Sequence, residues 1–107
     1  MKTFVFDIDG TICTLSNGDY ENAMPISYRI NKINKLYNEG NTIIFNTARG
    51  MGRYKNDASQ AHAALYDITI KQLNNWCVKY HKLFMGKPSG DIYIDDKGVN
   101  DEDFFKD

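Results

Sequence analysis

Short apolar segments that alternate with a helical pattern are the feature that most constrains the fold. Residues 3–8 (TFVFDI), 42–46 (TIIFN) and 91–94 (DIYI) are rich in the β-branched and aromatic side chains that favour strands. Between the first two, apolar residues recur at helical spacing from Ile26, with Pro25 before them and a glycine as the stop signal. The alternation predicts an α/β fold with a small, mainly parallel sheet.

The second half of the chain is less regular. Residues 82–85 (KLFM) are a candidate strand, Asp67 is a candidate N-cap of a helix, and residues 101–106 are expected to form a short helical turn. The link 86–90 (GKPSG) creates a conflict, because a crossover between parallel strands needs roughly a dozen residues. Either residues 82–85 are not a regular parallel strand, or strand 91–94 is very short.

Composition narrows the function classes. A chain of 107 residues with a net charge of −1 is expected to form a single domain, residues 1–107, with no electrostatic pull toward nucleic acid or anionic membranes. No apolar stretch approaches the ~20 residues of a membrane span. The N-terminal apolar run ends early, at Asp7, which is unlike a signal peptide, so we expect a cytoplasmic protein. Cys13 and Cys77 form no CxxC or Cys/His cluster and are not expected to act as nucleophiles.

A polar residue follows three of the apolar segments. These residues are Asp7, Thr47 and Asp95. The carboxyl ends of parallel strands meet at one edge of a sheet, where ligands bind in open α/β folds. We therefore expect the three side chains to converge on one rim.

Carboxylates crowded at a rim repel one another unless a cation lies between them. Mg²⁺ prefers oxygen ligands and keeps several waters, so Asp7 with Asp95 or Asp96 would suit it, whereas zinc usually takes His or Cys. Asp7 could then be both a ligand and the nucleophile that forms an aspartyl-phosphate.

Other side chains complete the predicted chemistry. Asp9 is a candidate general acid, and then general base for the hydrolytic water. Thr47 offers a hydroxyl donor and Lys87 a positive charge to a phosphoryl group.

Taken together, four motifs resemble the haloacid dehalogenase-like superfamily of phosphohydrolases. They are DxDGT at residues 7–11, an apolar strand ending in Thr47, Lys87, and the acidic pair Asp95 and Asp96. The resemblance implies a three-layer Rossmann-like core and catalysis by Asp7 and Asp9. It also implies a Mg²⁺ ion that is held by Asp7, by Asp95 and by the backbone carbonyl of Asp9. Asp96 would be an outer or alternate ligand.

The sequence YIDDKG, with GKP before it, further resembles small members of this superfamily that lack a cap domain and are linked to capsular polysaccharide biosynthesis. That resemblance implies a small phosphorylated metabolite as substrate, for example a sugar phosphate. Residues 12–24 and 48–66 are too short for a cap domain, so we expect an open site unless a neighbouring subunit of a homo-oligomer covers it.

Several alternatives stay open. Arg49 and Arg53 could clamp an anionic substrate or belong to a solvated loop, and Thr47 could simply cap a turn. Lys87 could be an ordinary surface lysine, and the late acidic pair a solvated turn. A phosphotransferase of the same superfamily and a non-catalytic phospho-ligand binding module are the alternative functions.

Overall fold

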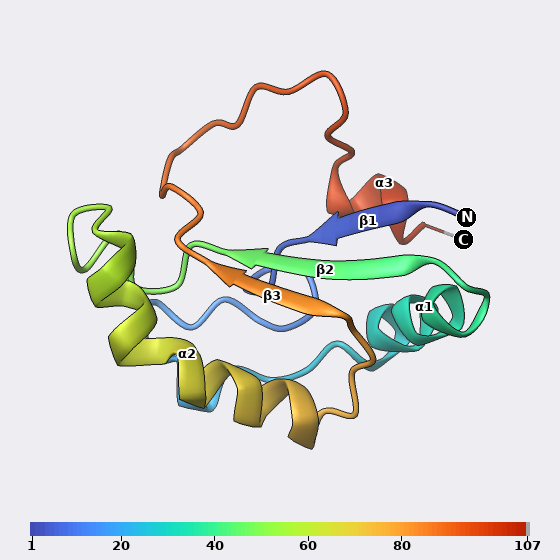
Figure 1. Ribbon diagram of the computed structural model, residues 1–107, viewed down its shortest axis with the longest axis horizontal. Coiled ribbons are helices and arrows are strands. Elements are labelled where there is room, and N and C mark those ends of the chain that lie inside the picture. The colour runs from blue at the N-terminus through green and yellow to red at the C-terminus, as the bar shows by residue number, and fades with distance from the viewer. Residues whose placement is uncertain (107) are drawn as a thin grey trace.

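A computed structural model describes residues 1–106 of the chain (Figure 1). Strands and helices alternate along the first 85 residues, and a long irregular segment leads to a final helical turn. The elements are β1 (Thr3–Phe6), the 3₁₀ turn η1 (Tyr20–Asn22), α1 (Ser27–Asn38), β2 (Thr42–Thr47), α2 (Ala58–Asn75), β3 (Lys82–Met85) and α3 (Asp101–Phe104).

The sheet has three parallel strands in the order β1-β2-β3. Its register pairs Val5 with Ile44, and Ile44 with Lys82. The predicted α/β fold with a parallel sheet is therefore confirmed, and residues 82–85 are a regular parallel strand. No helix within residues 1–106 has the length and apolar character needed to cross a bilayer.

The two faces of this sheet differ sharply. Phe6, Ile43 and Phe45 lie in the core with Ile33 of α1 and the inner side of α2, because two same-handed crossovers between successive neighbours put both helices on one face. On the other face Val5 is 61% exposed and Phe84 51% exposed, and no helix crosses in front of the strands in Figure 1. The described residues thus form two layers, and the expected three-layer core is not seen in them.

The N-cap of the long helix α2 lies ten residues before the predicted one. The side chain of Asp57 accepts a hydrogen bond from the backbone N–H of Gln60 and starts the helix, while Asp67 lies inside it. The prediction of Asp67 as N-cap was wrong because the alanine-rich stretch 58–64 has high helix propensity and a good cap of its own. The loop after β2 is correspondingly shorter than expected.

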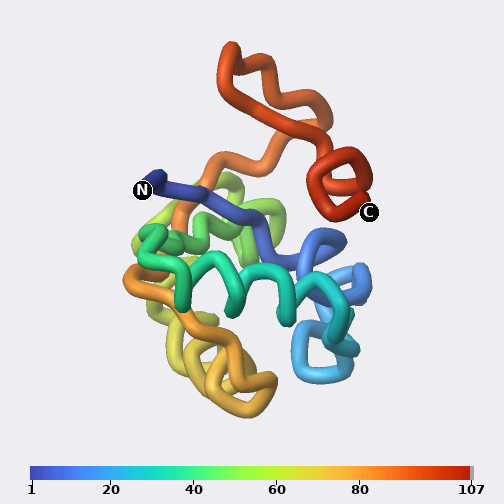
Figure 2. The backbone as a smooth tube through the Cα atoms, turned by 90° about the vertical axis from the view of Figure 1, so that its right-hand side faces the viewer, coloured from blue at the N-terminus to red at the C-terminus, as the bar shows by residue number. Residues whose placement is uncertain are grey.

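Residues 86–100 form no strand or helix, and we call this segment the arch. It leaves the end of β3, where Ser89 still donates a hydrogen bond to Asn56, and its later part passes outside β1 and stands away from the sheet (Figures 1 and 2). Ile92 is 80% exposed and Ile94 96% exposed, so the prediction of a strand at 91–94 was wrong for the described chain. The short link 86–90 explains this, since it cannot carry the chain back for a parallel pairing.

After the arch, α3 returns to the body and packs beside β1. The ring of Phe104 lies 5.8 Å from Phe4 and 5.5 Å from Phe6, and Phe105 is only 4% exposed. A salt bridge of 2.6 Å joins Arg29 of α1 to Asp101. The predicted final helical turn is confirmed, and its aromatic residues cover the core.

Candidate active site

Asp7 and Lys87 meet at the carboxyl end of the sheet. Asp7 directly follows β1, and the backbone N–H of Lys87 donates to the carbonyl of Thr47 at the end of β2 (3.1 Å). This anchor brings the Lys87 ammonium to 4.0 Å from Oδ1 of Asp7. The short link before residue 91 therefore does not keep Lys87 from the rim.

The surroundings of Asp7 act on its carboxyl group in opposite directions. Burial raises the pKa of Asp7 because it disfavours the charged form, and the nearby Lys87 ammonium offsets only part of that rise. A further positive charge beside Asp7 would favour the ionised form of its carboxyl group, which is the form that acts as a nucleophile.

Asp9, two residues on, has a different environment. Both of its carboxylate oxygens are held by the guanidinium of Arg49, with Nε to Oδ2 at 2.9 Å and Nη2 to Oδ1 at 3.0 Å. The thiol of Cys13 also lies 3.5 Å from Oδ1. Asp9 is thus a fixed acceptor of several donors rather than a free carboxyl group.

Arg49 is itself enclosed, being only 2% exposed. Its Nη1 donates to Thr69 (3.2 Å) and Gln72 (2.6 Å) on α2, and its guanidinium lies 4.8 Å from the ring centre of Tyr20. The prediction of Arg49 as a clamp for substrate is corrected, because every side of the guanidinium is already engaged. Arg53 is exposed and donates to the carbonyl of Gly18 (3.2 Å), which fits the solvated-loop alternative.

Sequence reasoning missed the residues that hold Arg49. Thr69 and Gln72 are three positions apart, and a polar pair at that spacing beside Leu65 and Leu73 interrupts the apolar side of α2. Such an interruption could have indicated a buried partner for one of the arginines.

Thr47 is only 1% exposed, and its hydroxyl oxygen accepts the backbone N–H of Arg49 (3.1 Å). This contact supports the turn-capping alternative. The contact uses only an acceptor site of the hydroxyl, so donation by Thr47 to a phosphoryl group stays a prediction.

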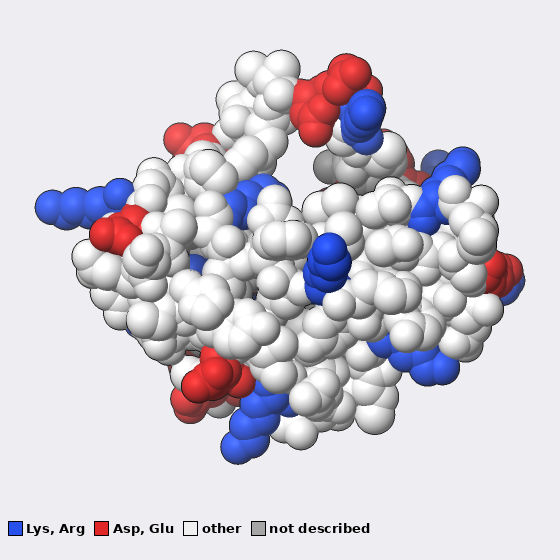
Figure 3. All heavy atoms as spheres, in the orientation of Figure 1, with Lys and Arg blue, Asp and Glu red and all other residues white. Residues whose placement is uncertain are grey.

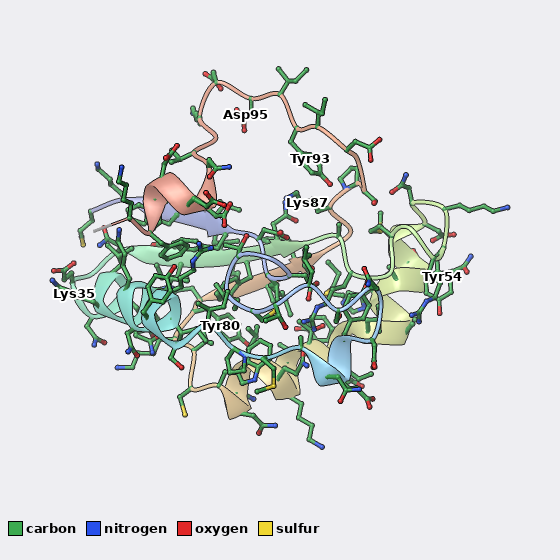
Figure 4. The ribbon with its side chains drawn as sticks, turned by 180° about the vertical axis from the view of Figure 1, so that it is seen from behind. Lys35, Tyr54, Tyr80, Lys87, Tyr93 and Asp95 are labelled. Carbon is green, nitrogen blue, oxygen red and sulfur yellow. The ribbon has the colours of Figure 1, made fainter. Side chains whose placement is uncertain are left out.

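The late acidic pair does not join the rim in the described chain. Asp95 and Asp96 are both exposed on the arch, and Figure 4 shows Asp95 well apart from Lys87. The backbone N–H of Lys97 donates to Oδ1 of Asp95 (3.0 Å) and, together with the side chain of Asp96, lowers the pKa of Asp95. The expected convergence of three strand ends is wrong for this residue, because the strand that was to deliver it does not form.

The predicted Mg²⁺ site is therefore divided. The donor types, carboxylate and carbonyl oxygen, suit a hard cation. Among residues 1–106, however, no three His, Cys, Asp or Glu side chains lie close enough together to hold a metal ion. One chain in this arrangement does not fit the cation.

The uncovered face of the sheet carries a shallow depression next to the rim. It has a volume of about 390 Å³ and is lined by Val5, Ile44, Phe84 and Lys87, among others. Tyr93 of the arch lies beside Lys87, with its ring centre 4.3 Å from the Lys87 ammonium (Figure 4). Lys87 thus faces both Asp7 and this open depression.

Comparison with known proteins yields one informative similarity. No family model matches the chain, and no curated protein matches it. A crystal structure of a structural-genomics target from Vibrio cholerae matches it with a TM-score of 0.91 and 28% identity, over 99% of this chain and 89% of that one. The small α/β fold described above is therefore also adopted by another protein.

Proposed function

We propose that this chain is a phosphohydrolase with a haloacid dehalogenase-like core that uses Asp7 as its nucleophile on a small phosphorylated metabolite. The observation that carries the proposal is the pairing of Asp7 and Lys87 at the carboxyl end of a parallel sheet, 4.0 Å apart. A carboxylate and an ammonium at this place can attack a phosphorus atom and neutralise its oxygens. The DxDGT sequence at residues 7–11 supports the same reading.

In the first step a carboxylate oxygen of Asp7 forms a bond to phosphorus, and the bond from phosphorus to the leaving oxygen breaks. The leaving oxygen takes up the proton that Asp9 carries, and an aspartyl-phosphate remains. In the second step water gives a proton to Asp9 and attacks phosphorus, the bond from phosphorus to the Asp7 oxygen breaks, and inorganic phosphate leaves. Lys87 attracts the phosphoryl oxygens in both steps.

The proposed acid and base role of Asp9 depends on its contact with Arg49. Because the guanidinium uses one acceptor site on each oxygen of Asp9, Asp9 must carry and deliver a proton through the lone pairs that Arg49 leaves free. We expect Asp9→Asn to lower kcat by about 10²- to 10⁴-fold, the usual contribution of a general acid or base.

Mg²⁺ dependence remains part of the proposal. Asp7 and the backbone carbonyl of Asp9 would hold the ion, and bound Mg²⁺ would neutralise charge on the phosphoryl group. Asp95 or Asp96 must complete this set, and neither does so within one chain as described.

The first test is hydrolysis of p-nitrophenyl phosphate with Mg²⁺. We expect turnover by the parent protein, loss in Asp7→Asn, and suppression by EDTA. The matched control is Asp67→Asn, which changes an exposed aspartate on α2 and should leave the rate unchanged. Equal rates in the parent and in Asp7→Asn would overturn the proposal.

The second candidate is a non-catalytic phospho-ligand binding module. The observation that favours it is the ion pair of Asp9 with Arg49, which holds Asp9 as a hydrogen-bond acceptor beside Asp7. Phosphate binding by a parent protein that shows no turnover of any phosphorylated sugar, nucleotide or amino acid in a panel would select this reading. The same panel would test the predicted sugar phosphate of surface polysaccharide synthesis.

A further inference from the structure

The outer edge of β1 lacks a partner strand. β1 ends the sheet, and in residues 1–106 its four residues make no hydrogen bond except those of its pairing with β2. An exposed edge of this kind pairs readily with another strand. The arch passes outside this edge without contacting it, and the space-filling view shows an opening between the two (Figure 3).

Residues 91–94 of the arch have the composition of a strand but pair with no other strand in the described chain. Ile92, Ile94 and Val99 are 80%, 96% and 67% exposed, which is an unusual cost for a soluble chain unless another surface covers them. Within residues 91–96 every charged side chain is acidic, namely Asp91, Asp95 and Asp96, while Lys87 and Lys97 lie on either side of this stretch.

The uncovered sheet face has the complementary character. Its strands present Val5, Ile44 and Phe84 with the basic residue Lys82, and Lys87 stands at its rim. No acidic residue occurs within β1, β2 or β3. In Figure 3 acidic side chains gather at the top of the arch beside one basic side chain, and a basic side chain lies near the centre of the body below.

The arch cannot reach the β1 edge of its own chain in the useful register. To place Asp95 beside Asp7 in a parallel pairing, Asp91 must lie beside Thr3. That point is roughly 16 Å back along the sheet and roughly 14 Å across it from Met85, about 21 Å in all. The six Cα steps from Met85 to Asp91 span at most about 20–22 Å when fully extended. Gly86 bends the chain at once, with a φ of +94°, so the required extension is not available.

We propose that a second copy of this chain supplies the missing strand: residues 91–94 of each copy pair in parallel with β1 of the other, and Asp95 of the partner subunit completes the site at Asp7. The exchange is reciprocal and forms a closed dimer, because the same arch and the same edge are used twice. The exchange would bring Asp95 of the partner subunit to the rim, where Asp7 lies. Within one chain these two carboxylates are far apart. The docking itself is independent of the proposed function, whereas completion of the site rests on it.

Disulfide trapping tests the docking without reference to activity. Both chains carry Cys77→Ser, one also carries Val5→Cys and the other, with a tag of different mass, carries Tyr93→Cys. In the proposed register these two positions are neighbours, so mild oxidation should join the two chains into a species of the combined mass. The pair Val5→Cys and Tyr28→Cys, with Tyr28 exposed on α1 at the covered side, is the matched control and should not cross-link.

Absence of cross-linked dimer at high protein concentration would overturn the proposal. So would a double variant carrying both cysteines in one chain that cross-links only within itself, at a mass of 12.3 kDa. Light scattering of the untreated parent should give twice that chain mass.

Subunit mixing tests whether the partner completes the site. Asp7→Asn and the double variant Asp95→Asn, Asp96→Asn should each be inactive alone. After the two are unfolded and refolded together, about a quarter of the parent's activity should return, because half of randomly paired dimers are mixed and each has one intact site. No recovery would mean that each chain uses its own acids. A parent without phosphatase activity would end the proposed function but leave the cross-linking result standing.

Discussion

Two segments of this chain have similar sequences and different structures. Residues 3–9 (TFVFDID) and 91–96 (DIYIDD) are both short apolar runs that lead into two acidic residues. The first forms β1 and brings Asp7 and Asp9 to the rim of the sheet. The second lies on the arch with Ile94 96% exposed.

The difference lies in how each segment is connected to the rest of the fold. β1 reaches β2 through the long stretch that contains α1, which is enough for a right-handed parallel crossover. The arch leaves β3 through a five-residue link, 86–90, and has no such route. β-propensity therefore decides which segments can be strands, and the length of the connection decides which of them find a partner.

The largest loss of stability is expected when Asp9, the second acidic residue of segment 3–9, loses its partner Arg49. Arg49→Met should destabilise the protein by about 3–5 kcal/mol, because it leaves the Asp9 carboxylate beside the core without its partner. Urea unfolding measures the change, and Arg53→Met, an exposed arginine in the same loop, should stay within about 0.5 kcal/mol of the parent. Similar effects of the two substitutions would mean that Arg49 does not hold Asp9.

The apolar residues that precede the two acidic pairs should also differ. Phe6 is 7% exposed and contacts the rings of Phe45 and Phe104. Phe6→Ala should cost about 3–5 kcal/mol in the unfolding of the monomer, and Ile94→Ala less than about 0.5 kcal/mol. If the arch exchanges between copies, Ile94→Ala should instead lower the dimer fraction in dilution experiments. A large effect of Ile94→Ala on a monomer would break the comparison.

The contributions of Asp7 and Asp95 to the stability of the fold should change with pH in opposite directions. Burial raises the pKa of Asp7, so ionisation above the unfolded value of 3.8 costs stability, and Asp7→Asn should raise the Tm at neutral pH but not at pH 3. The backbone N–H of Lys97 lowers the pKa of Asp95, so its small contribution is present at neutral pH and is lost as the solution is acidified. Asp95→Asn should therefore leave the Tm at neutral pH unchanged or slightly lower. A Tm of Asp7→Asn that tracks the parent at every pH would contradict this account.

The smallest effect is expected for the ion pair at the rim. Lys87→Met should lower stability by about 0.2–1 kcal/mol at neutral pH, because both side chains are partly exposed. The loss should shrink in high salt and disappear once Asp7 is protonated. Urea unfolding at two salt concentrations measures it, and Lys82→Met on β3 is the control without a carboxylate partner in the described structure.

Much of the body could be predicted from the sequence. The strands at residues 3–6 and 42–47 and the helix α1 follow directly from apolar periodicity and from the stop at Gly40. The position of Asp7 follows from the same pattern, since a residue after a parallel strand must lie at the rim. The place of Lys87 depends on a backbone hydrogen bond to Thr47 that no sequence pattern reveals.

What could not be predicted depends on long-range partners. Arg49 is held by Thr69 and Gln72, which lie 20 and 23 positions away in the sequence. The strand at 91–94 was expected from propensity alone, although the short link before it already spoke against a parallel pairing. In this segment the length of the link decides the structure, and the apolar pattern does not.

The two cysteines differ in reactivity, which allows selective labelling of the protein with a dye. Burial and the neighbouring Asp9 raise the pKa of the Cys13 thiol to about 12, so at neutral pH that sulfur is almost entirely unreactive. Cys77, just beyond α2, is exposed. A maleimide dye should therefore attach to the unmodified chain at a single known place, and energy transfer between donor-labelled and acceptor-labelled molecules would report association in real time without any substitution.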